Sequence, residues 1–182
     1  MPSGTSRRPS IGRCVLTAVL ASCVAGASGC PPGADLQPSD APTSTEAVSA
    51  RVTRVTDGDT FHAVVAGAAE TVRLIGVDTP EVDWYGGEGE CFGPEAARYA
   101  QDRLSDRSVG LAFDRDLRDR YGRLLAYVTL GSELFNLTLV DEGYAVTLEV
   151  PPNTARADEF RAAEASSRER GVGLWAACPS PD

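Results

Sequence analysis

Three short segments of the chain combine acidic and arginine side chains that could act together on a phosphate ester. They are residues 57–60 (Asp-Gly-Asp-Thr), 73–81 (Arg-Leu-Ile-Gly-Val-Asp-Thr-Pro-Glu) and 119–123 (Asp-Arg-Tyr-Gly-Arg). Two of the carboxylates could hold a hard divalent cation, and a third could orient a water molecule. The guanidinium groups could neutralise the negative charge that grows on a phosphate during cleavage. These residue types therefore indicate metal-assisted cleavage of a phosphodiester bond.

Each segment alone is weak evidence for a site. Asp-Gly pairs such as residues 57–58 are common in turns, and acidic turns are common on protein surfaces. Pro80 could simply end a strand and leave Glu81 in water. The combination of all three segments carries the prediction.

In this order and at this spacing, the three segments resemble the staphylococcal nuclease (thermonuclease) family. The resemblance runs from about Arg51 to Trp175 and so covers most of the chain. It implies an α+β fold, a five-stranded OB-fold β-barrel with three helices, whose face and loops bind oligonucleotides. Further matching stretches are residues 93–96, 124–128, 136–143, 152–153 and 173–175.

The resemblance implies a reaction centre built around calcium. It makes Asp59, Asp78 and the backbone carbonyl of Thr79 the ligands of Ca²⁺, an ion that prefers oxygen donors. It makes Glu81 the base that activates water. The expected substrates are DNA and RNA, and the expected cut leaves a 5′-hydroxyl and a 3′-phosphate.

Two arginines and one aromatic side chain complete the implied site. Arg73 and Arg123 would stabilise the charge of the transition state. Arg73 lies five residues before Asp78, so in an unbroken strand their side chains would point to opposite faces. The resemblance, not the spacing, therefore places Arg73 in the site. Tyr121 and Arg120 are expected to contact the substrate, although Tyr121 also fits a packing position at the barrel edge.

Other interpretations remain open beside the nuclease. The chain could be a non-catalytic OB-fold module that binds nucleic acid or protein, or a structural lipoprotein of the cell envelope. Two departures from the family bear on substrate affinity: an acidic loop over residues 82–90, and Leu148 near the place of a second nucleotide-contacting tyrosine. The single histidine, His62, fits a solvated strand position.

Residues 1–30 have the pattern of a secretory signal peptide. They hold three arginines and no acid, and an apolar run from Cys14 to Gly29 that is short for a spanning helix. Cys30 ends a lipobox-like stretch and is the favoured lipidated residue, with Cys23 as the alternative. Residues 6–8 leave open a twin-arginine export route instead of the general one. We expect an exported protein, anchored in the cell envelope by lipid or secreted.

Cysteine use supports export. If Cys14 and Cys23 leave with the leader and Cys30 carries lipid, Cys91 and Cys178 remain as a pair. In an oxidising compartment a disulfide between them is the favoured interpretation, and two separate thiols are the alternative.

The chain is acidic, with 17 basic residues, all arginine, against 26 acidic residues and a net charge of −9. Removal of the leader would leave 14 basic residues against 26 acidic ones, a net charge of −12. A broad basic surface for DNA is therefore excluded, so contact with nucleic acid must be local. Composition predicts a flexible tether over residues 31–50, one domain over 51–178 that we expect to be monomeric, and a tail over 179–182.

Residue patterns also predict the elements of the domain. Alternating and β-branched stretches indicate five strands, and residues 66–69 connect the second and third as a hairpin. Apolar residues at helical spacing indicate three helices later in the chain. Asn136 is expected to cap the second helix, and Asn153 or Thr154 the third. The predicted strands are residues 51–56, 60–65, 71–77, 109–113 and 124–130, and the predicted helices are residues 95–104, 137–142 and 155–170.

Overall fold

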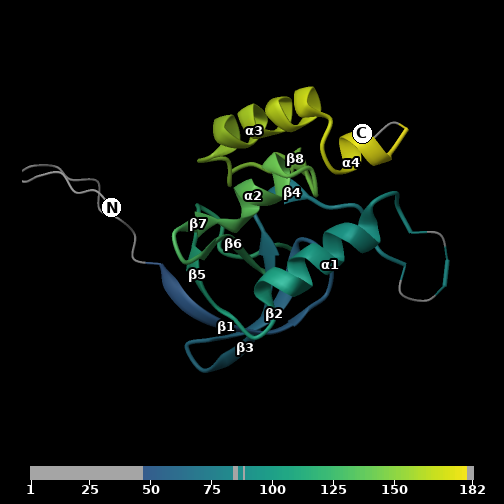
Figure 1. The fold of residues 1–182 in the computed structure, drawn as a ribbon. Helices are drawn as coiled ribbons and strands as arrows, with labels where there is room; N and C mark the ends of the chain where they lie inside the picture. The colour runs from purple at the N-terminus through teal and green to yellow at the C-terminus, as the bar shows by residue number, and fades with distance from the viewer. Residues whose placement is uncertain (1–46, 84–85, 88, 180–182) are drawn as a thin grey trace, which may run out of the picture. The chain divides into compact units, whose positions relative to one another are not determined.

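The protein is described by a computed structural model over residues 47–83, 86–87 and 89–179 (Figure 1). The predicted signal peptide, with Cys23 and Cys30, and almost all of the predicted tether lie outside these residues. Export and lipid attachment therefore stay predictions. Among the described residues, no helix is long and apolar enough to cross a membrane.

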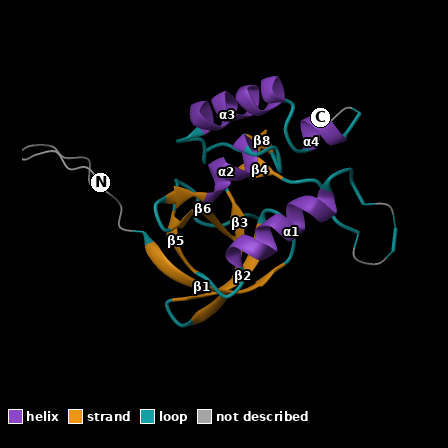
Figure 2. Cartoon of the chain, in the orientation of Figure 1, coloured by secondary structure: helices purple, strands orange, loops and turns teal. Residues whose placement is uncertain are grey.

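Five strands close into a barrel (Figure 2). Four neighbouring pairs are antiparallel, in the order β3-β2-β1-β5-β6, and β3 pairs with β6 in parallel to complete the ring. This closed barrel with helices confirms the predicted α+β, OB-fold class. The strands are β1 (Val48–Val55), β2 (Thr60–Val65), β3 (Ala68–Leu74), β5 (Ser108–Ala112) and β6 (Leu124–Leu130).

Three short strands lie outside the five-stranded ring. β7 (Glu133–Leu134) extends the sheet beside β6. β4 (Gly76–Asp78) and β8 (Val146–Leu148) form a separate antiparallel pair. The sequence pattern did not reveal β8, because three residues with half-exposed side chains leave too little alternation to recognise.

The helices are α1 (Gly93–Leu104), α2 (Phe135–Asp141), α3 (Ala157–Arg170) and the single turn α4 (Leu174–Ala177). Helix α1 packs on β1, and α2 lies between the barrel and α3 (Figure 1). Three predicted helices are therefore present, and α4 was not anticipated. The core that these elements enclose contains the fully buried rings of Phe61, Phe135 and Phe160.

The predicted strand over residues 71–77 is broken at Ile75, and this correction positions the site. Gly76 has φ of 81°, a left-handed conformation that suits glycine. Ile75 lies in neither strand: β3 ends at Leu74 in the barrel sheet, and Gly76 begins β4 in the separate two-stranded sheet. The break removes the two-residue alternation that would have sent Arg73 and Asp78 to opposite faces.

Asn136 supports this break and does not cap α2 as predicted. Its side chain is fully buried, and its amide nitrogen donates to the carbonyl oxygens of Ile75 at 2.9 Å and Ala126 at 3.2 Å. Its amide oxygen accepts from the Val128 N–H at 2.8 Å. The N-cap residue of α2 is Leu134, without a side-chain cap. Asn136 thus replaces ladder hydrogen bonds where β3 ends.

Asn153 likewise has a different role from the predicted helix cap. Its side chain accepts from the Asp116 N–H and donates to the Asp116 carbonyl oxygen, each at 2.8 Å. Helix α3 begins later, with Arg156 as its N-cap residue and no side-chain cap. Asn153 therefore joins two loops, residues 114–118 and 150–154, instead of starting a helix.

Candidate active site

The turn between β1 and β2 presents Asp59 to the interior of the site. Asp59 is 5% exposed, and its Oδ2 accepts from the amide N–H of Thr79 at 2.9 Å and from the Thr79 hydroxyl at 3.2 Å. Its Oδ1 accepts from the Thr60 hydroxyl at 3.0 Å. Gly58 makes this approach possible, because a Cβ there would lie 2.6 Å from the Thr79 methyl. Asp59 is therefore fixed against Thr79 by several contacts.

Arg73, near the end of β3, joins the two proposed acidic ligands. Its Nη1 lies 2.5 Å from Oδ2 of Asp59, and its Nη2 lies 2.6 Å from Oδ1 of Asp78. The same Nη1 also donates to the carbonyl oxygen of Val77 at 3.0 Å. The arginine side chain is only 12% exposed, so the guanidinium and the Asp59 carboxylate form a largely buried ion pair. The structure thus brings together Arg73, Asp59, Asp78 and Thr79.

Glu81 is exposed beside this group. Loss of hydration is the main cause that raises the pKa of Glu81, and the negative charges of Asp59 and Asp78 raise it further. A base with a raised pKa holds a proton more strongly, which favours proton abstraction near neutral pH. The location therefore suits the predicted role, which stays a prediction.

Two more carboxylates show how strongly negative this region is. Burial first, and then the charge of Asp59, raise the pKa of Asp57 to about 6. Burial also raises the pKa of Asp78, although Arg73 opposes the effect. Four acids around one arginine leave negative charge that a further cation would offset.

The turn of residues 119–123 presents the second arginine separately. Nε of Arg123 donates to Oδ2 of Asp119 at 2.7 Å, and the amide N–H of Arg123 donates to Oδ1 at 2.9 Å. Tyr121 is 68% exposed, which excludes the alternative of a packing residue at the barrel edge. Arg120 lies over its ring at 4.8 Å and donates to its hydroxyl at 2.6 Å.

One pocket of about 480 Å³ brings the two arginines to a common surface. Its lining includes the two arginines and the predicted substrate contacts, together with Leu148: Arg73, Arg123, Tyr121, Arg120 and Leu148. The β3–β6 parallel pairing explains this, because Arg73 is aligned with Leu125, two residues beyond Arg123. The pocket can therefore present two guanidinium groups and an aromatic ring to one phosphate-bearing ligand.

The donor set fits a hard divalent cation. Oxygens of Asp59 and Asp78 converge on one positively charged group, the Arg73 guanidinium, and oxygen donors are those that Ca²⁺ prefers. Within the described part of the chain, no cluster of three His, Cys, Asp or Glu side chains is arranged as a metal site. The proposed set has only two carboxylates, so a backbone carbonyl and water would supply the remaining donors.

Three functional candidates were missed from the sequence. Asp57 and Asp119 lie inside the recognised segments, and only their contacts distinguish them from ordinary turn residues. Glu90 lies in the acidic loop and accepts from the N–H of Glu81 at 2.9 Å. The composition of the loop indicates negative charge, and nothing in it indicates a hydrogen-bond partner nine residues away.

The closed barrel carries two acids paired with Arg73 and a pocket lined by Arg73 and Arg123, which is an arrangement suited to phosphodiester cleavage. Comparisons with known proteins agree. A family model described as staphylococcal nuclease homologue matches residues 71–177. The thermonuclease of Staphylococcus intermedius is 39% identical over 124 residues, 68% of this chain and 74% of that protein.

Two further relatives extend the match. The thermonuclease of Staphylococcus hyicus is 36% identical over 125 residues, 69% of this chain and 74% of that protein. Endonuclease YncB of Bacillus subtilis (strain 168) is 35% identical over 130 residues, 70% of this chain and 62% of that protein. The chain belongs to the staphylococcal nuclease family, as the sequence analysis predicted.

Proposed function

We propose that the protein is an exported, Ca²⁺-dependent nuclease that cleaves DNA and RNA and leaves 3′-phosphate ends. As a member of its family it is a phosphodiester-hydrolysing nuclease. The observation that carries the finer proposal is the convergence of Asp59 and Asp78 on Arg73 beside Glu81. The leader pattern and the cysteine pair support export, and the match to a lipobox supports a lipid anchor on Cys30.

The residues of the chain divide the work of the reaction. Glu81 takes a proton from the attacking water, whose oxygen then bonds to phosphorus. The bond between phosphorus and the 5′ oxygen breaks, and this oxygen leaves and takes a proton from solvent to become the 5′-hydroxyl. Arg73 and Arg123 donate hydrogen bonds to the phosphate oxygens, and these bonds strengthen as negative charge grows on them. Asp59, Asp78 and the Thr79 carbonyl would hold Ca²⁺, which supplies positive charge beside the phosphate when bound. Tyr121 offers a ring on which a base can stack, and Arg120 a local positive charge.

Cleavage of single-stranded DNA and of RNA with and without Ca²⁺ tests the proposal. We expect cleavage with Ca²⁺ and none once a chelator has removed it. Magnesium replacing calcium with equal turnover would contradict the choice of ion. The ends of the products are a second readout: 5′-hydroxyl ends accept phosphate from a polynucleotide kinase without prior dephosphorylation. Ends that need dephosphorylation first would contradict the proposed direction of cleavage.

Glu81→Gln tests the base. We expect turnover to fall by about 100-fold or more, the scale for losing a general base, while the amide keeps the shape of the side chain. Glu95→Gln is a matched control, because Glu95 is an exposed acid in the first turn of α1. Equal turnover of Glu81→Gln and wild type would show that another group takes the proton.

A further inference from the structure

Glu90 makes hydrogen bonds to both main-chain polar groups of Glu81, the N–H and the carbonyl oxygen. The Glu81 N–H donates to Oε2 of Glu90 at 2.9 Å, and the Glu90 N–H donates to the carbonyl oxygen of Glu81 at 2.9 Å. The two residues are nine positions apart, so this pair of hydrogen bonds closes the loop that follows Glu81. The backbone of the proposed base is thereby fixed through Glu90.

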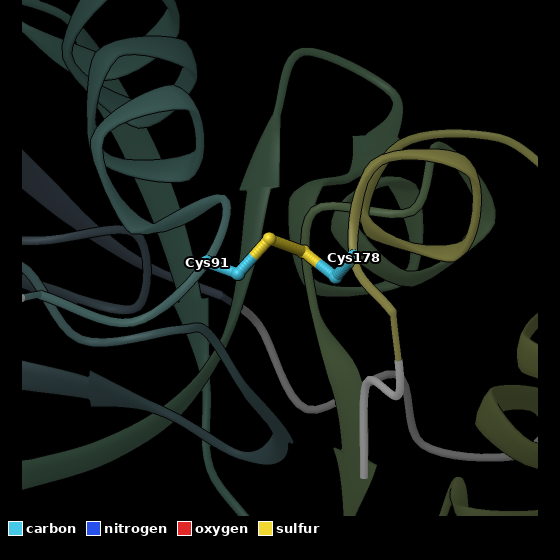
Figure 3. The surroundings of a disulfide bond; sticks show 2 residues. All are labelled: Cys91 and Cys178. Carbon is cyan, nitrogen blue, oxygen red and sulfur yellow. A yellow bond between two sulfur atoms is a disulfide. The ribbon is translucent and has the colours of Figure 1, made fainter.

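The next residue, Cys91, is covalently attached to the other end of the domain. Its sulfur is bonded to that of Cys178, which is 87 positions further along the chain, and the two Cα atoms are 5.9 Å apart (Figure 3). This is the disulfide that the cysteine pattern favoured. Cys178 follows directly on α4, and its N–H donates to the Leu174 carbonyl oxygen at 2.9 Å.

Helix α4 is a firm attachment point for this bond. Leu174 is 1% exposed, and its N–H donates to the Gly143 carbonyl oxygen at 2.8 Å. The Trp175 indole N–H donates to the hydroxyl of Ser167, which is buried in α3, at 2.9 Å. The disulfide therefore ties the loop of Glu90 to a helix that is fixed on the core.

The chain after Cys91 also lies against Glu81. Gly93 is buried, and a Cβ there would contact the carbonyl oxygen of Glu81. Phe92 has φ of 73°, and its ring lies 5.6 Å from that of Tyr144. The segment 90–93 therefore supports the Glu81 backbone directly, and the disulfide is attached in the middle of that support.

We propose that Glu90 is a positioning residue for Glu81 and that the Cys91–Cys178 disulfide keeps it in place, so that full nuclease activity requires the oxidised cysteine pair. This inference rests on the proposed role of Glu81 as the base. Without the bond, the segment 90–93 loses its covalent link to α4, and the Glu90 contacts lose that part of their support. A base displaced by about 1 Å can lose up to about 100-fold in rate, because its proton transfer depends on geometry.

The redox step is an ordinary thiol–disulfide exchange. Dithiothreitol gives two electrons and two protons to the Cys91–Cys178 bond, which yields two protein thiols and one cyclic disulfide. Oxidised glutathione reverses the change: the two protein thiols become a disulfide, and glutathione disulfide becomes two glutathione thiols. No other reactant is needed for either direction.

The first test measures kcat and KM of the full chain on single-stranded DNA, oxidised and after reduction by dithiothreitol. We expect reduction to lower kcat about tenfold with KM nearly unchanged, and oxidised glutathione to restore it. The double variant Cys91→Ser, Cys178→Ser should have the low kcat in both states, which controls for effects of the dithiol on calcium or substrate. Unchanged kcat, with two additional thiols titrated after reduction, would overturn the proposal.

The second test separates positioning from stability. Glu90→Gln keeps an oxygen that accepts from the Glu81 N–H, so we expect it to retain kcat within about threefold, whereas Glu90→Ala should lose about tenfold with KM unchanged. Glu95→Ala removes the same charge nearby and should leave kcat unchanged. Equal kcat for Glu90→Ala and wild type would overturn the role of Glu90. Failure of the proposed base is a separate outcome, which Glu81→Gln measures. If that variant is as active as wild type, Glu81 is not the base, whatever the activities of the Glu90 variants.

Discussion

The two arginines of the site are held in different ways. Arg73 is 12% exposed and contacts acids from two other elements, the turn before β2 and the end of β4. Arg123 is 31% exposed and pairs with an acid of its own turn, Asp119. The position of Arg73 therefore depends on the folded barrel, whereas the position of Arg123 depends on contacts within the five-residue turn 119–123. Equal roles in catalysis can therefore have unequal consequences for folding.

The difference follows from burial. A charge removed from a buried pair leaves its partner without compensation. Asp119 is partly exposed and keeps hydrogen bonds from the N–H groups of Tyr121 and Arg123, so it loses less when the Arg123 side chain is removed. Because Arg73 neutralises Asp59 inside the fold, its loss must affect stability as well as rate. Loss of Arg123 should affect rate almost alone. Variants at both positions test this separation.

Arg73→Ala should have the largest effect. We expect kcat/KM to fall on the order of 1000-fold, because a donor to the transition state is lost. We also expect the free energy of unfolding to fall by about 3 kcal/mol, because Asp59 stays buried without its partner. Denaturant titration and initial rates measure the two quantities.

Arg103→Ala is the matched control for Arg73→Ala. Arg103 also has two polar partners, Glu133 and the Tyr99 hydroxyl, but its side chain is about a third exposed and lies on α1. Activity should stay at the wild-type level, and stability should fall by about 1 kcal/mol or less. If Arg73→Ala proved as stable as this control, the buried pair would contribute little to the fold.

Arg123→Ala should lower kcat/KM by about 100-fold and leave the melting temperature nearly unchanged. Arg123→Lys keeps the charge but loses the forked donor geometry, so it should recover only part of the rate. Full recovery by lysine would indicate that Arg123 acts through charge alone. A marked drop in melting temperature for Arg123→Ala would contradict the contrast with Arg73.

The same contrast explains what the sequence could predict. Periodicity predicts the main strands and helices, and the three charged segments predict the family, which the comparisons confirm, and the reaction centre, which stays a prediction. The approach of Arg73 to Asp78 could not be derived from spacing, because it depends on the break at Gly76 and on Asn136. That asparagine bonds to residues far along the chain, so its amide was mistaken for a helix cap.

The sequence also did not reveal hydrogen bonds between residues that are far apart in the chain. Nothing near Glu81 in the sequence indicates Glu90, and Asn153 reaches Asp116 across 37 residues. The disulfide was an exception, since a pair of remaining cysteines in an exported chain has one possible partner each. The number of remaining cysteines therefore predicted a long-range contact that hydrophobic periodicity could not.

Gly58→Ala tests how closely the Asp59 turn must approach Thr79. An added Cβ would lie 2.6 Å from the Thr79 methyl and 2.8 Å from its hydroxyl oxygen, so the turn must shift. We expect a loss of about 1 to 3 kcal/mol in stability and about tenfold in kcat/KM, because Asp59 and Arg73 move together. Calorimetry and initial rates check both; if both stayed at wild-type values, the turn would have room that the contacts do not suggest.

The smallest effect is expected at His62, whose ring contacts Arg54 and Thr71, neither of which is a proposed site residue. Its Nε2 lies 2.6 Å from Nη2 of Arg54, which can only donate, so His62 is an acceptor there and neutral in the fold. Burial first, and then the Arg54 charge, lower the pKa of His62 below 6.5. The unfolded chain therefore binds this proton more readily, and stability falls as the pH drops below about 6.5 towards the lower pKa of the folded state. His62→Asn should remove this part of the pH dependence while leaving kcat unchanged. Melting temperatures of both proteins between pH 7.5 and 5.5 measure it, and identical losses in the two would mean that His62 titrates alike in the folded and unfolded chains.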